Sequence, residues 1–302
     1  MFGTVYTTQF VFFNLFDKSC SFSTDFTPFL SIFRCFSDQA YGSIRKMNTV
    51  MPNEAELETV RRLDGERYLC AMFASPDRRT ALLALLAFNL ELARIPELVS
   101  EALLGQMRLQ WWRQSIDGIY QGQVPDHPIG RMLADAVTEH SLDKGLFDEI
   151  LDAREGDLTE VAFEDIHGLE SYAEATGGAL NQLMAKVLSL DRQHVDTLVR
   201  PIGTAWALTG LLRAMPFHQA QGRRYITMLP QQVAATAAGL IADARSRAGK
   251  TERKMMPVLL PAVLGEYYLR RLAQSGYDAA HSSTCIPPMD PPATANNRSI
   301  SR

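Results

Sequence analysis

The segment PDRRTALLALLAFNLELARI, residues 76–95, is apolar on nearly every side of the helix that its composition favours. A helix that is hydrophobic all round has to be covered by other elements, because a surface helix shows only one apolar stripe. Elsewhere between about 54 and 275 the apolar residues recur every three or four positions, which is the helical period. No segment in this range alternates convincingly with the period of a half-buried strand. The pattern predicts an all-α fold, a single helical bundle that encloses residues 76–95.

Composition divides the chain into three parts. Residues 1–50 are predicted to be a poorly ordered extension, rich in Phe and Ser, and translation could start at Met47 or Met51 instead. Residues 51–277 are predicted to form the helical domain, and residues 278–302, rich in Pro, Ser and Asn, a disordered tail. The helices expected within the domain cover residues 53–74, 76–95, 100–122, 127–140, 144–158, 168–190, 192–215, 231–248 and 253–275.

Charge and cysteine content exclude several classes of protein. The net charge of −4 gives the chain no nucleic-acid electrostatic footprint. The four cysteines are scattered, with no C-x-x-C spacing, which argues against a zinc site and against a disulfide framework. The segment TGGALNQL contains Gly177 and Gly178 but lacks the Lys-Ser/Thr ending of a phosphate loop, so close packing of helices is the expected reason for these glycines.

Seven stretches of the chain occur in the order and spacing of one enzyme family. They are RYLCAMFASPDRRTALLALLAFNLEL, RLQWWRQSIDGIYQG, HPIGRMLADAV, FDEILDAREGDL, LESYAEATGGALNQL, GTAWALTGLLRAMP and GRRYITMLP. Together they resemble the squalene/phytoene synthase family over residues 54–275. The resemblance implies a bundle of the isoprenoid (trans-prenyl) synthase type with a central apolar cavity. Within the family, FNLELARIPE, RLQWWR and DAREGDL are most similar to a non-catalytic branch that resembles the assembly factors of respiratory complex I.

Active members of the family carry aspartates four residues apart on two facing helices. Because a helix turns every ~3.6 residues, such pairs project from one face. They can hold Mg²⁺, which prefers oxygen ligands and neutralises a diphosphate leaving group. The first motif aligns with Ala93, Arg94, Ile95, Pro96 and Glu97, where only Glu97 keeps an acid. Pro96 also predicts that the helix ends or kinks there.

The second motif aligns with residues 214–218 and with the G-R-x-Y that follows. Both aspartate positions are lost, one to Ala214 and the other to His218, and no Asp or Glu stands between Asp196 and Asp243. Imidazole cannot replace two carboxylates around magnesium. The sequence therefore predicts that the second metal site is absent. What remains at this rim is basic: Arg213, Arg223 and Arg224.

Two interpretations of the remaining charged residues stay open. In one, an anionic headgroup binds directly to the basic rim, with a candidate ligand set of Glu91, Arg94, Asp157, Arg213, His218, Arg223, Arg224 and Tyr225. In the other, these residues form a solvated face or pair with nearby acids, and Glu91 pairs with Arg94 along one helix. A metal held instead by Glu91, Glu97, Asp152 and Asp157 is a further alternative, although Arg154 and Arg94 could equally pair with these acids. Trp111 and Trp112 are expected to be core residues.

Three functions follow from the resemblance. The first is a catalytically inactive synthase-like protein that acts in complex I assembly, contacts complex I subunits or assembly intermediates, and binds an isoprenoid diphosphate, another isoprenoid or a phospholipid. The second is an active Mg-dependent prenyl diphosphate transferase with remapped ligands. The third is a generic helical module that binds lipid. The first predicts no catalytic residue and no cofactor, and it places the protein in a bacterial cytoplasm, peripherally at the inner membrane, or in a mitochondrial matrix.

Overall fold

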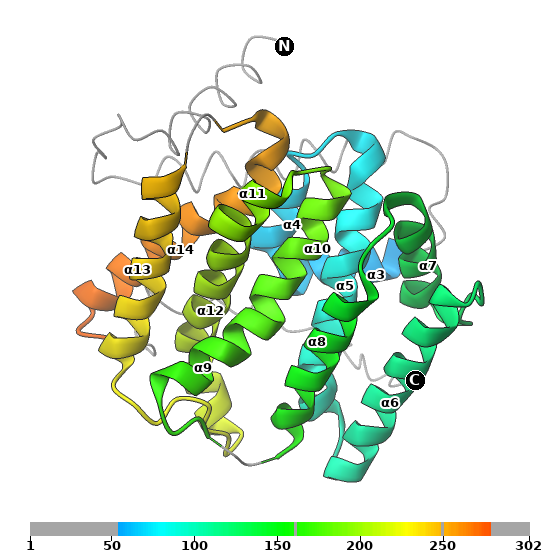
Figure 1. Cartoon of the computed structure of the whole chain (residues 1–302). Coiled ribbons are helices and arrows are strands. Elements are labelled where there is room, and N and C mark those ends of the chain that lie inside the picture. Colours follow the sequence, from blue (N-terminus) through cyan, green and yellow to red (C-terminus); the bar gives the residue numbers. More distant parts are fainter. Residues whose placement is uncertain (1–53, 160–161, 249–250, 279–302) are drawn as a thin grey trace, which may run out of the picture.

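The computed structural model describes residues 54–159, 162–248 and 251–278, which form a bundle of packed helices (Figure 1). The α-helices are α3 (Glu54–Leu63), α4 (Gly65–Ala71), α5 (Pro76–Leu98), α6 (Ala102–Tyr120), α7 (Pro128–His140), α8 (Lys144–Glu155), α9 (Ile166–Ala173), α10 (Ala179–Val187), α11 (Arg192–His194), α12 (Arg200–Ala220), α13 (Pro230–Arg247) and α14 (Met256–Gln274). Short 3₁₀ or π segments join some of them: η1 (Gly156–Leu158), η2 (Glu174–Gly178), η3 (Val195–Val199) and η4 (Arg253–Met255). The prediction of an all-α fold is confirmed.

The structure refines several of the predicted helices. The first one is broken at Asp64, whose backbone leaves the helical region (φ −138°) just before Gly65. The helix predicted for 168–190 contains the π segment η2, and α12 continues through Pro216 to Ala220. Within the described residues the only β-like pairing is an isolated parallel bridge between Phe163 and Ile226. The predicted N-terminal extension lies outside the described residues, as does the tail beyond residue 278.

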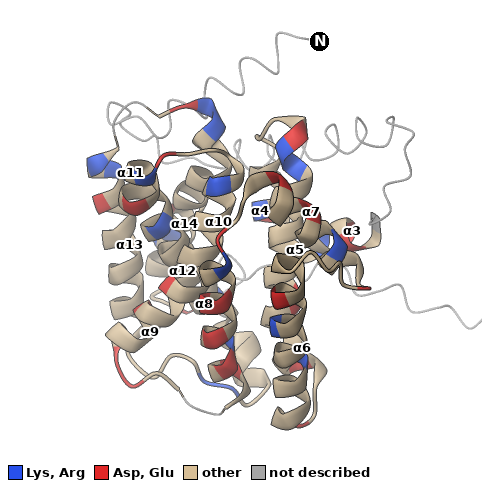
Figure 2. Cartoon of the chain, turned by 45° about the vertical axis from the view of Figure 1, so that its right-hand side comes forward, with Lys and Arg blue, Asp and Glu red and all other residues tan. Residues whose placement is uncertain are grey.

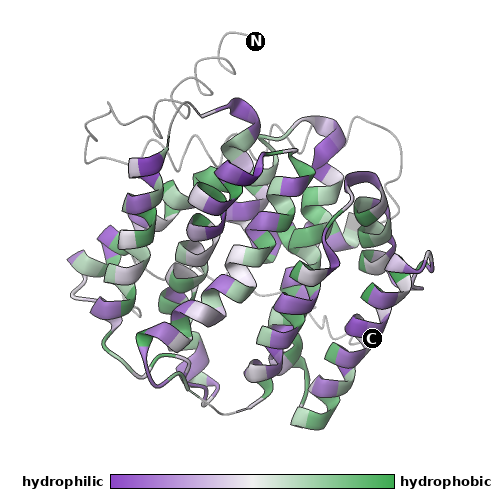
Figure 3. Cartoon of the chain, viewed as in Figure 1, coloured by the Kyte–Doolittle hydropathy of each residue, from purple (hydrophilic) through white to green (hydrophobic). Residues whose placement is uncertain are grey.

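Helix α5 runs through the centre of the bundle, as its apolar sequence predicts. Every residue from 81 to 88 is buried, and Figure 3 colours the ribbon by the hydropathy of each residue. The ring of Phe88 packs edge-on against those of Trp112, at 5.2 Å between centroids, and Phe147, at 5.6 Å. These contacts join α5 to α6 and α8. No helix among the described residues combines the length and the apolar character needed to cross a membrane.

Glycines bring η2 and α12 into direct backbone contact. A Cβ on Gly177 would lie 2.5 Å from the carbonyl oxygen of Gly203, and a Cβ on Gly203 would lie 2.3 Å from the carbonyl oxygen of Gly177. Asn181, one turn further along, donates hydrogen bonds to the carbonyl oxygens of Val199 (2.7 Å) and Val258 (3.2 Å). The expectation that close packing explains these glycines is confirmed.

Candidate functional site

The first motif position lies in the last two turns of α5. Ala93 and Arg94 are half-buried, Pro96 is buried, and the helix ends at Leu98, two residues after the proline. Loss of hydration raises the pKa of Glu97, while the charges of Arg94 and Arg223 act in the opposite direction. One carboxyl group and two guanidinium groups therefore influence each other at this end of the bundle.

The expected ion pair between Glu91 and Arg94 is not formed. The i, i+3 spacing permits it, but neither side chain has an ion-pair partner among the described residues. The charge of Arg94 acts to lower the pKa of Glu97, which lies three residues further along the same helix. Arg94 therefore interacts electrostatically with a residue at the end of α5. There Pro96 interrupts the hydrogen-bonding pattern of the helix.

The second motif position lies in the last turns of α12. Ala214 and His218 are half-buried, and the helix ends at Ala220. Gly222 then adopts a left-handed conformation (φ 73°), and the amide of Arg223 donates to the carbonyl oxygen of His218 at 2.9 Å. This turn is a common way to end a helix, because glycine reaches positive φ without steric cost.

Arg223 joins the two motif positions. Its Nη2 donates a hydrogen bond to the carbonyl oxygen of Pro96 in the last turn of α5. Carbonyls in the last turn of a helix lack an intrahelical partner, and a cation there also interacts favourably with the negative end of the helix dipole. A protein side chain therefore bridges the two helix ends on which the family resemblance places the metal motifs.

The segment that follows Arg223 is hydrogen-bonded to the segment that follows η1. The amide of Phe163 donates to the carbonyl oxygen of Tyr225 (3.3 Å), and the hydroxyl of Thr227 donates to the carbonyl oxygen of Phe163 (2.6 Å). The ring of Tyr225 then lies 4.7 Å from that of His218 and 6.3 Å from that of Tyr172, measured between centroids. Residues 222–227 thus close this end of the bundle.

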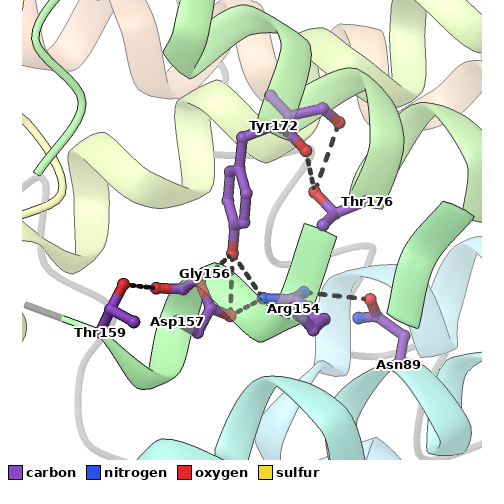
Figure 4. A network of polar contacts seen from close by, with 8 residues as sticks. Asn89, Arg154, Gly156, Asp157, Thr159, Tyr172 and Thr176 are labelled. Atoms are coloured by element: carbon purple, nitrogen blue, oxygen red, sulfur yellow. Dashed lines mark hydrogen bonds and ion pairs between the residues drawn. The ribbon is translucent and has the colours of Figure 1, made fainter. Parts of the chain in front are cut away.

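Beneath this segment, four side chains from different elements form a polar network (Figure 4). The hydroxyl of Tyr172, from α9, donates to Asp157 in η1 at 2.8 Å. Arg154, at the end of α8, donates through Nη1 to Asp157 (3.0 Å) and to the oxygen of Tyr172 (2.8 Å). Its Nη2 approaches Oδ1 of Asn89, on α5, at 3.4 Å. Asp157 is the acid that the sequence singled out, and both its oxygens are engaged by these protein groups.

The electrostatics of the network favour one charged pair and neutral neighbours. Burial acts to lower the pKa of Arg154, but Tyr172 and Asp157 raise it above its usual value. Burial raises the pKa of Tyr172 well above its usual range, and burial together with Asp157 raises that of Tyr225 to about 12. Burial also lowers the pKa of His218, against the opposing effect of Asp157. A guanidinium group therefore stands beside this carboxylate, and His218 is neutral at physiological pH.

Arg213 belongs to a separate cluster. Its Nη2 lies 2.9 Å from the carboxylate of Glu66, on α4, and its guanidinium carbon lies 3.5 Å from the ring centroid of Tyr268, on α14. The hydroxyl of Tyr268 donates to the same carboxylate at 2.6 Å. Burial acts to raise the pKa of Glu66, but Arg213 and Tyr268 lower it below its usual range. Arg213 thus holds α12 against α4 and α14 through its contacts with Glu66 and Tyr268. Arg224 is exposed.

The acids of the remapped-metal alternative do not come together. Asp152 lies on the outer side of α8, where it pairs with Arg113 of α6 at 2.6 Å, and Glu155 pairs with the same arginine at 2.9 Å. Asp157 is buried within the Arg154 network. In the part of the chain that the structure describes, no three His, Cys, Asp or Glu side chains are grouped so as to hold a metal ion. The residues at the two motif positions do not fit a magnesium–diphosphate site.

Three participants were not identified from the sequence. Asn89 is the one strongly polar side chain inside the apolar run ALLALLAFNL, and that isolation was a signal. Tyr172 and Glu66 carried no such signal, because their partners are distant in sequence.

The expectation that Trp111 and Trp112 are both core residues is correct for one of them. Trp112 is buried, with 2% of its surface exposed, whereas Trp111 keeps 40% exposed.

The fold and this site define a class of protein: a bundle of the isoprenoid-synthase type with no acid pair at its second metal motif. Comparison with solved structures supports the fold, since a dehydrosqualene synthase superposes with a TM-score of 0.65 at 17% identity, over 76% of this chain and 89% of the other. The squalene/phytoene synthase family model matches residues 60–229, and the chain belongs to that family.

Curated relatives of two kinds match the chain. A Bos taurus protein named NADH dehydrogenase (ubiquinone) complex I, assembly factor 6, is 33% identical over 251 residues, which covers 75% of each chain. A presqualene diphosphate synthase of Sinorhizobium fredii is 30% identical over 119 residues, 39% of this chain and 42% of that protein. The chain thus resembles both a protein named an assembly factor and a protein named a synthase.

Proposed function

We propose that the protein is a non-catalytic member of its family that acts in the assembly of respiratory complex I. The observation that supports the proposal is that side chains of the protein itself engage the groups at and beside the two motif positions. Arg223 bridges the ends of α5 and α12, and Arg154 with Tyr172 occupies both oxygens of Asp157. The similarity to the assembly factor of Bos taurus, over 75% of both chains, supports the same conclusion.

Prenyl transfer at this site would lack its main source of charge stabilisation. A departing diphosphate needs preorganised positive charge in an apolar cavity, which divalent metals supply in active relatives. Here Glu97 is the one acid left at the first motif position, and the second has none. The bundle has kept its packing while its metal-ligand positions carry Ala93, Arg94, Ala214 and His218.

Deletion of the gene, followed by native-gel measurement of assembled complex I, tests the assembly role. The deletion strain should hold less assembled complex I, and the wild-type chain should restore it. The double variant Glu91→Gln/Glu97→Gln should restore it equally, because no carboxylate chemistry at α5 is involved. A folded double variant that fails to restore complex I would contradict the non-catalytic proposal, and normal complex I in the deletion strain would contradict the assembly role.

We also propose that the site binds an isoprenoid or a phospholipid through its anionic headgroup. Arg94, Arg223 and Arg224 lie at this end and form no ion pair within the described residues, and arginine binds phosphate oxygens in bidentate fashion. Arg213 is excluded from this set because Glu66 already pairs with it. Native mass spectrometry of the purified protein should detect a bound lipid that the Arg94→Ala/Arg224→Ala variant loses. Arg192→Ala, which removes an exposed arginine of α11, is the control, and no lipid in either preparation would refute this part.

The second candidate function is an active prenyl diphosphate transferase, favoured by the similarity to the presqualene diphosphate synthase of Sinorhizobium fredii. It is tested by incubating the protein with farnesyl or geranylgeranyl diphosphate and Mg²⁺. The first proposal expects diphosphate release no faster than in buffer. Magnesium-dependent release above that background, abolished by Glu97→Gln, would establish the second candidate instead.

A further inference from the structure

Helix α6 carries an exposed apolar stripe. Leu103, Met107 and Trp111 recur every fourth residue and keep 62%, 61% and 40% of their surfaces exposed, and Leu98 and Leu104 flank them with 46% and 45%. The described residues contain ten large hydrophobic side chains with this degree of exposure, and half of them lie in this stretch. Such concentration marks an interaction surface, because single exposed apolar residues are normally scattered.

The opposite face of α6 already forms its core contacts. Leu109, Trp112, Ile116 and Ile119 are buried on that face, so the stripe is not needed to hold the helix on the bundle. An ordinary surface helix would carry polar residues on its outer side. The N-terminal half of α6 instead carries Leu103, Leu104 and Met107 on its outer side, beside the exposed Gln106 and Gln110, and its lower end is green in Figure 3. From Gln114 onward, one turn beyond Trp111, polar residues take over the outer face.

Trp111 is held in a fixed orientation on this surface. Its ring packs edge-on against Trp112, at 4.9 Å between centroids, and against His127 at the start of α7, at 5.3 Å. A side chain that is already ordered loses little conformational entropy when a partner covers it. Aromatic side chains that become buried when a partner binds carry much of the binding energy in protein interfaces.

The charges around the stripe distinguish a protein partner from a membrane. Interfacial membrane helices are rich in Lys and Arg on their polar face. Helix α6 has no lysine and two arginines, of which Arg113 is engaged by Asp152 and Glu155. Arg108 is exposed and forms no ion pair within the described part of the chain, while Glu101, also exposed, precedes the helix. Charges of both signs, Glu97, Glu101 and Arg108, therefore border the stripe, which complements a protein surface rather than anionic lipid. Figure 2 colours the charged residues of the described chain.

We infer that this stripe, Leu98, Leu103, Leu104, Met107 and Trp111, is the docking surface for a protein partner. The occupant is an apolar protein surface with an acidic side chain opposite Arg108 and a basic one opposite Glu101. Enrichment in Trp, Met and Arg is the composition that distinguishes protein interfaces from other surfaces. The inference rests on the proposed assembly function, which requires contact with subunits or assembly intermediates.

The test uses the full chain in a strain that lacks the gene. The variant Leu103→Glu/Met107→Glu places two charges on the stripe, and Gln231→Glu/Gln232→Glu places the same two on exposed positions of α13, across the bundle from α6 (Figure 1). Both variants should match the wild type in circular dichroism and melting temperature. The α13 control should restore assembled complex I fully. The α6 variant should restore at least fivefold less assembled complex I than the wild-type chain. A photo-crosslinking residue at position 107, but not at 231, should join the chain to a complex I subunit or assembly intermediate.

The outcomes separate the two proposals. Full restoration by the α6 variant in a strain where deletion reduces complex I would overturn the docking surface alone. Normal complex I after deletion would overturn the proposed function instead. Co-sedimentation with anionic phospholipid vesicles that the α6 variant abolishes would assign the stripe to a membrane. A dimer in light scattering that the α6 variant splits would assign it to a second copy of this chain. Either result would also overturn the inference.

Discussion

Gly203→Ala should destabilise the bundle because two backbones touch at this residue. The new Cβ would lie 2.3 Å from the carbonyl oxygen of Gly177 and 2.6 Å from the Cβ of Asn181, about 1 Å closer than the ordinary contact of 3.4–4 Å. Neither neighbour can rotate away, since one is backbone and the other is the base of a side chain whose amide holds two carbonyls. The helices themselves would have to separate.

The size of the effect is the balance of two opposing contributions. Overpacking of a rigid site costs roughly 1–3 kcal/mol, and occasionally more. Replacing glycine by alanine inside a helix contributes about 1 kcal/mol in the other direction. The net expectation for Gly203→Ala is a loss of about 0–2 kcal/mol, and more if the Asn181 hydrogen bonds break as well. For a domain of this size each kcal/mol corresponds to about 2–4 °C in melting temperature.

The control lies on the same helix. A Cβ on Gly210 would meet nothing within 4 Å, so Gly210→Ala should gain about 0.5–1 kcal/mol from propensity alone. Urea unfolding followed by circular dichroism measures both variants. Equal stabilities, within 0.5 kcal/mol, would refute the argument from backbone contact. The double variant Gly177→Ala/Gly203→Ala should cost less than the sum of its parts, because the separation is needed only once.

Three further predictions concern charged groups. Arg154→Met should cost about 3–5 kcal/mol, because it strands the carboxylate of Asp157 in the interior, and adding Asp157→Asn should recover much of that in urea unfolding. Burial lowers the pKa of His140 and Arg78 adds to this, so the folded protein binds fewer protons than the unfolded chain below the usual value of 6.5. Stability should therefore fall as the pH drops from 6.5 towards the folded pKa, and thermal melts of His140→Asn should show a weaker fall. Arg113→Gln should cost less than about 1 kcal/mol in the same unfolding assay, because both its acidic partners are more than half exposed.

Local sequence was enough to predict what depends on one helix at a time. The apolar run at 76–95 identified α5 as the central helix, and the glycine pair at 177–178 indicated a close helix contact. The loss of acids at Ala214 and His218 was also visible, because it needs only the helical period and the family motif. The absence of strand-like alternation between 54 and 275 was enough for the fold class.

What sequence alone did not provide was the choice of partner. Arg213 was assigned to a basic rim, but its partner Glu66 is 147 residues away along the sequence. No local pattern around either residue indicates that the two form an ion pair. Trp111 and Trp112 are neighbours on a helix that is apolar on both faces, so the period could not say which of them is buried. Glu91 and Arg94 have suitable spacing, yet spacing only permits an ion pair, and the surroundings decide whether it forms.

The replacement of acidic by neutral or basic residues at the two motif positions has a consequence for folding. A site built from several carboxylates repels itself until a cation binds, so its stability depends on the ligand. In this chain the corresponding interactions are made by the protein: Arg223 with the end of α5, and Arg154 with Asp157. The first contact joins the segment after α12 to the end of α5, and the second holds η1 against the end of α8, where Tyr172 of α9 binds the same carboxylate. Arg223 and Arg154 lie outside the four substituted motif positions, so these contacts stabilise this end of the bundle independently of a bound cation.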